Sequence, residues 1–102
     1  MRDGAPSTAC FLSQQLAEKY LKGLLVSNGT EFPKTHDLLA LLSLVPPGVA
    51  GAGLLKADLQ LLNRYAIELR YPTDIPEVTQ RDAEEAAMAA RRVRDFVRAH
   101  VE

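Results

Sequence analysis

The chain has 102 residues, of which 47% are hydrophobic and 25% charged, with a formal net charge of −1. This length suits one domain and is too short for two, and the near-neutral charge excludes a global positive field that would attract nucleic acid or an anionic membrane. The single cysteine excludes an internal disulfide, and one cysteine with two distant histidines gives no recognisable zinc set. No signal-peptide core and no apolar run of roughly 20 residues is present, so we expect a cytoplasmic protein without membrane contact, metal or cofactor.

Hydrophobic periodicity predicts helices and no strand. The first helix is expected over about residues 8–28, because Ser7 or Thr8 can cap its start and Gly29 suits the left-handed position that ends a helix. Apolar side chains cover more than half of its circumference. This helix therefore needs partners on several sides.

Two further helices are expected in the middle of the chain. Thr35 can cap a short helix over about residues 36–45, which the Pro46-Pro47-Gly48 segment ends. Leucines in alternating three- and four-residue steps predict a third helix over about residues 54–69, and Pro72 prevents its continuation.

The last helix is expected over about residues 80–101. Thr79 and Asp82 have the spacing of a capping box at its start. Its core stripe is mostly alanine, which allows close packing against the first helix. The four helices predict an all-α protein, an antiparallel (up-down) helical bundle that forms a single domain over residues 1–102.

Three short segments carry a family resemblance: Gln14-Gln15-Leu16-Ala17-Glu18-Lys19, Lys34-Thr35-His36-Asp37-Leu38 and Arg70-Tyr71-Pro72. With them the chain resembles the HEPN domain (higher eukaryotes and prokaryotes nucleotide-binding) over nearly its whole length. The resemblance implies an antiparallel helical bundle, commonly with an additional helix before the Gln-Gln segment. That helix is missing here, which indicates a shortened member or a trimmed start.

The resemblance also implies three kinds of function. HEPN proteins include metal-independent RNases that are often toxins, proteins encoded beside a minimal nucleotidyltransferase, and nucleotide binders. The RNases carry an Arg-x(4 to 6)-His motif, in which histidine is the acid or base and arginine stabilises phosphate charge. The one match here joins Arg94 to His100, whose side chains point about 120° apart on an unbroken helix. These two residues and His36 are the weak catalytic candidates.

The candidate ligand-binding residues are Lys34, His36, Arg70 and Tyr71. His36 lies at a helix start, where backbone amides favour anions; alternatively its neighbours cap the helix and His36 only occupies the first turn. Arg70 can bind phosphate in bidentate fashion beside Tyr71, or it can satisfy carbonyls at the broken helix end while Tyr71 packs under the loop. Lys19 can likewise reach a ligand or extend into water.

Three arginines, Arg91, Arg94 and Arg98, share an arc of about 60° on the last helix and could follow a nucleic-acid backbone. Asp95 and Glu102 lie four residues after two of them, which favours a solvated, ion-paired face.

We therefore expect a non-catalytic module that binds a nucleotide, an RNA phosphate or a partner, in a toxin–antitoxin-like pair with a minimal nucleotidyltransferase. One alternative is a metal-independent RNase toxin that uses Arg70 or Arg94 with His36 or His100. A second is a purely structural dimerisation module. The strongly apolar first helix also favours a homodimer, or a complex with a partner chain, that covers its exposed side.

Overall fold

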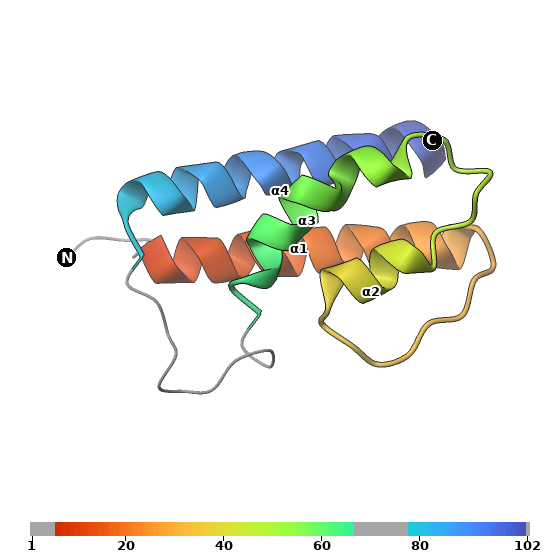
Figure 1. The fold of residues 1–102 in the computed structure, drawn as a ribbon, viewed down its shortest axis with the longest axis horizontal. Helices are drawn as coiled ribbons and strands as arrows, with labels where there is room; N and C mark the ends of the chain where they lie inside the picture. Colours follow the sequence, from red (N-terminus) through yellow and green to blue (C-terminus); the bar gives the residue numbers. More distant parts are fainter. Residues whose placement is uncertain (1–5, 67–77, 102) are drawn as a thin grey trace.

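The computed structural model describes residues 6–66 and 78–101. In these ranges the chain forms four α-helices, one short 3-10 helix and no strand, which confirms the expected all-α class (Figure 1). No helix of the described part is long and apolar enough to cross a membrane. The elements in chain order are α1 (Pro6–Ser27), α2 (Leu38–Ser43), η1 (Ala52–Leu55), α3 (Lys56–Asn63) and α4 (Gln80–Val101).

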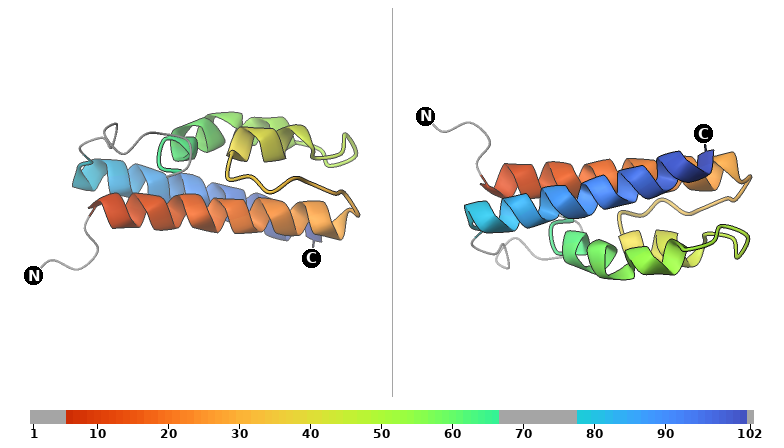
Figure 2. Two further views of the ribbon diagram at one scale, coloured as in Figure 1. Left: turned by 90° about the horizontal axis from the view of Figure 1, so that it is seen from below. Right: turned by 90° about the horizontal axis from the view of Figure 1, so that it is seen from above.

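The helices form two layers. Helices α1 and α4 lie side by side, and α2, η1 and α3 cover one face of this pair (Figure 2). Helices α2 and α3 are antiparallel, as are α3 and α4, whereas α1 and α4 run in the same direction (Figure 1). Residues 28–37 carry the chain back along α1, so α1 and α2 also point the same way. The opposite face of the α1–α4 layer is not covered by any described helix.

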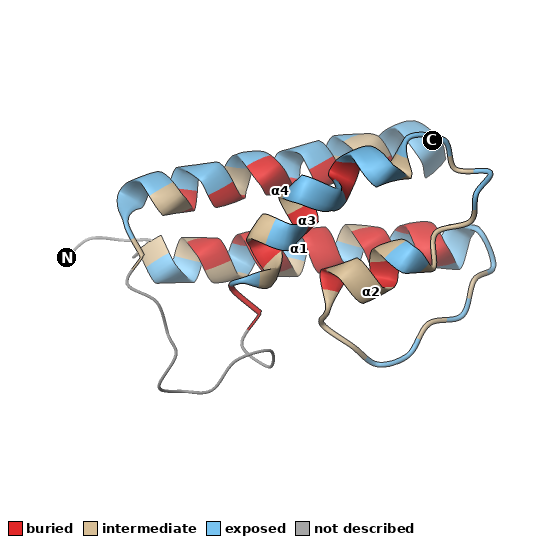
Figure 3. Ribbon diagram, in the orientation of Figure 1, coloured by how far each residue is buried: buried red, intermediate tan, exposed pale blue. Residues whose placement is uncertain are grey.

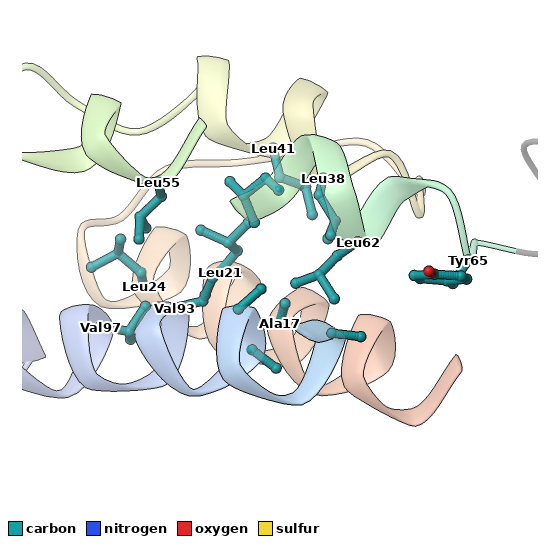
Figure 4. Packing of buried hydrophobic residues seen from close by; sticks show 14 of the residues in the cluster. Ala17, Leu21, Leu24, Leu38, Leu41, Leu55, Leu62, Tyr65, Val93 and Val97 are labelled. Atoms are coloured by element: carbon teal, nitrogen blue, oxygen red, sulfur yellow. The ribbon is translucent and has the colours of Figure 1, made fainter. Parts of the chain in front are cut away.

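The hydrophobic core lies between the two layers (Figures 3 and 4). Fully buried leucines of α1, α2 and α3 meet there, and each stabilises the fold by about 2 kcal/mol through burial of apolar surface. Helix α4 adds buried alanines that let it approach α1 closely, as its sequence predicted. The core includes Ala17, Leu21, Leu24, Leu38, Leu41, Leu59, Leu62, Ala86, Ala90 and Val93.

A bidentate ion pair also joins the layers. Arg92 of α4 donates from Nε to Oδ2 of Asp58 at 2.9 Å and from Nη2 to Oδ1 at 2.8 Å. Asp58 lies on α3, so this pair connects the second layer to α4.

The start of α4 agrees with its predicted capping box. The Thr79 hydroxyl accepts a hydrogen bond from the Asp82 amide at 3.1 Å, and the Asp82 carboxylate accepts one from the Thr79 amide at 3.0 Å. At the end of α1, Gly29 has φ of 69°, the left-handed conformation expected of it.

The start of α2 differs from the prediction. Asp37, not Thr35, is the N-cap, and its Oδ1 accepts from the amides of Leu39 and Ala40 at 3.0 and 3.3 Å. The Thr35 hydroxyl instead accepts from the Asp37 amide at 3.1 Å. Threonine therefore stabilises the turn that precedes the helix, and α2 begins two residues later than expected.

The third helix is shorter than predicted. A 3-10 turn at Ala52–Leu55 precedes it, and it ends at Asn63, whereas the sequence predicted helix through Leu69. After Asn63 the amides of Arg64, Tyr65 and Ala66 bond to carbonyls three residues earlier. These tighter bonds end the α-helix before the undescribed residues 67–77.

Candidate functional site

Two of the segments that suggested the family lie in direct contact. Glu18, on α1, is only 6% exposed, and its carboxylate meets the imidazole of His36 from the segment between α1 and α2. The Nδ1 atom of His36 lies 2.8 Å from Oε1 and 3.0 Å from Oε2 of Glu18. The carboxylate therefore determines which way the ring faces.

Further polar groups complete this contact. Lys22, one turn after Glu18 on α1, donates from Nζ to Oε2 of Glu18 at 2.9 Å. Gln14 donates from Nε2 to Oε1 of Glu18 and to the His36 carbonyl, both at 3.2 Å. Among the described residues, no buried side-chain nitrogen or oxygen lacks a hydrogen-bond partner. We call Gln14, Glu18, Lys22 and His36 the Glu18 cluster.

The Glu18 cluster keeps its carboxylate ionised. Burial by itself would raise the pKa of Glu18, but hydrogen bonds from Lys22, His36 and Gln14 outweigh it and lower the pKa below its ordinary value of 4.5. With Glu18 charged, the Nδ1–H of His36 is the donor in their contact. The other ring nitrogen, Nε2, then points away from Glu18 because the two nitrogens lie on different sides of the ring.

The start of α2 does not offer the anion site that its sequence suggested. Its amides are already bonded to side chains of the chain itself: Leu38 donates to Oδ1 of Asn63 at 2.8 Å, and the next two amides donate to Asp37. Asn63 also donates from Nδ2 to Asp37 Oδ1 at 2.8 Å. Any phosphate contact at His36 must therefore come from side chains.

Lys34 is the nearest exposed cation along the chain to His36. It lies two residues earlier, and it makes no hydrogen bond or ion pair with the described residues. Arg70 and Tyr71, the other two ligand-binding candidates, lie outside the described residues. The structure thus places Lys34 and His36 on one short extended segment beside α1.

The catalytic pair suggested by the sequence is not brought together. Arg94 bonds from Nε to Oδ1 of Asp95 at 3.0 Å. His100 donates from Nδ1 to the Phe96 carbonyl at 2.8 Å, and its ring centroid lies 4.2 Å from that of Phe96. Each side chain is engaged within α4, and no hydrogen bond joins the two. No group of three or more acidic, histidine or cysteine side chains in the described ranges could hold a metal.

Three contributions to this site were not predicted from the sequence: the burial of Glu18, the hydrogen bonds of Gln14 and the hydrogen bonds of Asn63 to the start of α2. One signal was available for the first two, since Gln14 and Glu18 lie one turn apart on the same side of the first helix. Asn63 gave no local signal, because its partners Asp37 and Leu38 are distant in sequence.

The fold and the cluster together define a small helical-bundle domain in which a buried glutamate on the first helix orients a histidine from the next segment. The model of the HEPN domain family matches residues 1–100, and the chain belongs to this family. HEPN domains are known for nucleotide- and RNA-related roles. No curated protein and no solved structure matches the chain at a significant level.

Proposed function

We propose that this protein is a binding module for the phosphate of a nucleotide or an RNA, which His36 and Lys34 contact. The observation that carries the proposal is the orientation of His36 by the buried carboxylate of Glu18, at 2.8 Å. Burying the Glu18 carboxylate costs desolvation free energy, which three hydrogen-bond donors must offset. A single imidazole in a surface segment does not need this arrangement merely to fold. The arrangement gives the ring a fixed orientation toward a ligand.

The local charges are consistent with an anionic ligand. Glu18 is neutralised by Lys22, and the Asp37 carboxylate accepts bonds from two α2 amides and Asn63. Lys34 supplies positive charge beside His36. Hydrogen bonds from charged donors to phosphate are about twice as strong as neutral ones, which suits a phosphate contact made by few side chains.

The geometry of the described residues favours binding over an RNase that uses Arg94 with His100; Arg70, the other arginine of that alternative, lies outside the described residues. An RNase of this family needs a histidine and an arginine at one phosphate, and the Arg94–His100 pair is engaged within α4 instead. Purified metal-free protein tests this alternative directly. RNA cleavage that disappears in both His36→Gln and His100→Ala preparations would replace binding by catalysis as the function.

The binding experiment uses ¹⁵N-detected NMR of the histidine rings, titrated separately with ATP and with a short oligouridine. We expect the His36 signals to shift, and Lys34→Gln or His36→Gln to weaken binding about tenfold, the loss typical of one charge-assisted hydrogen bond. Lys56→Gln is the matched control, because Lys56 is an exposed cation on α3 without a partner among the described residues. Absence of any shift at millimolar ligand would refute the proposal.

The proposal includes a partner chain. We propose that the module works in a toxin–antitoxin-like pair with a minimal nucleotidyltransferase, an arrangement found in the family it belongs to. A nucleotidyltransferase encoded in the neighbouring gene that forms a stoichiometric complex with this chain in gel filtration would support the pair. A gene neighbourhood without one would remove this part of the proposal and leave phosphate binding standing.

A further inference from the structure

The uncovered face of the α1–α4 layer is hollowed where the two helices meet. One hollow of about 530 Å³ lies between Gly23 of α1 and Val97 and Val101 of α4. A second of about 410 Å³ lies nearer the helix starts, between Ala9 and Ala87. We call this face the α1–α4 seam and define it by Leu12, Leu16, Lys19 and Gly23 on α1 and Met88, Arg91 and Arg98 on α4.

The floor of the seam exposes aliphatic side chains. Leu12 is 58% exposed, Leu16 37% and Met88 51%. Leu12 and Leu16 follow Ala9 and precede Gly23 in three- and four-residue steps, so they share one stripe of α1 with residues that line both hollows. A continuous exposed apolar stripe of this kind marks an interaction surface.

The α4 side of the seam is basic. Arg91, Arg94 and Arg98 follow one another in three- and four-residue steps and therefore share a face. Their sequence predicted that Asp95 would pair with Arg91, but Asp95 bonds to Arg94 at 3.0 Å. Arg91 consequently makes no ion pair with the described residues. Arg98 makes none with them either, and Glu102, its predicted partner, lies outside the described residues.

The α1 side adds another cation. Lys19 lines the larger hollow and also has no ion-pair partner among the described residues. Among the residues that the structure describes, Glu84, near the start of α4, is the one acid that lines either hollow. The seam thus has three cations that make no ion pair with the described part of the chain, around an aliphatic floor.

We propose that the α1–α4 seam binds one acidic amphipathic helix of a partner protein. The α1 helix has 22 residues and a length of about 33 Å, enough for a docked helix of several turns. Leucine-type side chains of the partner would occupy the two hollows, and its carboxylates would reach Lys19, Arg91 and Arg98. Gly23 leaves room for this contact, because an added Cβ there would meet nothing within 4 Å.

Two other occupants fit the observations less well. Single-stranded RNA is bound on aromatic platforms on which bases stack, whereas this floor is aliphatic apart from Tyr20. A second copy placed by two-fold symmetry would bring the same face against itself, and cations would then meet cations. Charge therefore favours an acidic partner.

This inference specifies the chemistry of a partner and does not depend on the phosphate site. Leu16 and Glu18 lie about 160° apart around α1, so the seam and the Glu18 cluster use opposite sides of the helix. Variants in one region leave the other intact, and failure of either idea can be recognised separately.

The test is fluorescence anisotropy with a labelled peptide of about 21 residues, long enough to follow most of α1. Leucines occupy one face of the peptide at three- and four-residue spacing, and glutamates flank them. We expect micromolar binding that weakens as salt rises, and a scrambled peptide of the same composition to bind at least tenfold more weakly. Arg91→Gln and Arg98→Gln should each weaken binding about two- to fivefold.

Two further variants probe the floor. Leu16→Gln removes exposed apolar surface, and Gly23→Leu fills the larger hollow; both should weaken peptide binding while circular dichroism shows an unchanged fold. Lys56→Gln, outside the seam, should leave binding unchanged.

Three results would overturn the inference. The first is a failure of specific binding: the scrambled peptide binds equally well, or the designed peptide does not bind even at about millimolar concentration, far above the expected micromolar affinity. The second is a dimer in light scattering that Leu16→Gln dissociates, which would assign the seam to a second copy. The third is oligouridine that binds more tightly than the peptide and is lost in Arg91→Gln, which would assign it to RNA.

Discussion

The two faces of the α1–α4 layer differ in whether their charged side chains form ion pairs with the described residues. On the covered face, Glu18 bonds to Lys22 and His36, and Arg92 holds Asp58 in a bidentate pair. The residues next to them in the sequence, Lys19 and Arg91, lie on the seam and have no ion-pair partner among the described residues. The same helices therefore supply structural charges on one face and available charges on the other, and the second layer of helices makes the difference.

The largest expected contrast is between leucines of the two faces. Leu21→Ala removes a fully buried side chain from the core and should lower the free energy of unfolding by about 3 kcal/mol. Leu12→Ala, at 58% exposure on the seam, should change it by less than about 0.5 kcal/mol. Urea denaturation followed by circular dichroism measures both. Equal losses would mean that the seam is as closely packed as the core and would abolish the contrast.

The adjacent residues Glu18 and Lys19 give the second contrast. Glu18→Gln leaves the Lys22 ammonium beside a neutral amide and weakens the contact with His36. It should cost about 2 kcal/mol, less than for a fully buried pair because Lys22 and His36 are partly exposed. Lys19→Gln should change stability by less than about 0.5 kcal/mol. Denaturant midpoints of the two variants, compared with the unsubstituted chain, provide the measurement.

Acid should weaken the covered face through the same carboxylate. Folding lowers the pKa of Glu18 below 4.5, so its stabilising contribution is complete above pH 4.5 and is lost as pH falls through the lower folded value. Unfolding free energies measured along a descending pH series should therefore fall less steeply for Glu18→Gln than for the unsubstituted chain. Parallel curves would show that Glu18 is not the group responsible.

A smaller effect is expected at alkaline pH. Tyr65 is 3% exposed beside Cys10, and burial, reinforced by that thiol, raises the pKa of Tyr65 from 10 to about 12. The stabilising contribution of the neutral phenol is complete below pH 10 and is lost as pH rises through about 12, a change of about 3 kcal/mol at most. Tyr65→Phe should remove this alkaline loss in urea denaturation. Retention of the loss in Tyr65→Phe would assign it to another group.

The smallest effect has the opposite sign. Gly23→Ala places a methyl group in the open hollow of the seam, where nothing lies within 4 Å, and should stabilise α1 by about 0.5–1 kcal/mol. Ala17→Gly, in the fully buried stripe of the same helix, should destabilise by at least that amount. Thermal melts of the pair distinguish the faces. A loss of stability in Gly23→Ala would show that the hollow is filled.

Local signals in the sequence were enough to predict the family, the end of α1 and both ends of α4. Thr79 and Asp82 form their capping box because both partners lie within one turn, and Gly29 ends α1 because its left-handed conformation is a local property. The alanine stripe of α4 predicted close packing with α1 for a similar reason. Small side chains on one face of a helix allow the axis of a neighbouring helix to come close.

Contacts between segments that are far apart in the sequence could not be predicted from these local signals. The end of α3 at Asn63 and the capping of α2 by Asp37 belong to one arrangement whose members lie 25 and 26 residues apart. The burial of Glu18 could not be predicted, because nothing in the first helix shows that residues 28–37 fold back over it. By spacing alone, Asp95 could pair with Arg91 or with Arg94. The structure shows that it pairs with Arg94.

The two bonds of Asn63 also have a consequence for the dynamics of the second layer. Its side chain joins the first turn of α2 to the last residue of α3, so the Leu38 amide can exchange its hydrogen with solvent only after the Asn63 contact has opened. The start of α2 and the end of α3 should then exchange with similar protection factors, although a long connection separates them in the chain. We therefore expect α2 and α3 to open together as one cooperative unit.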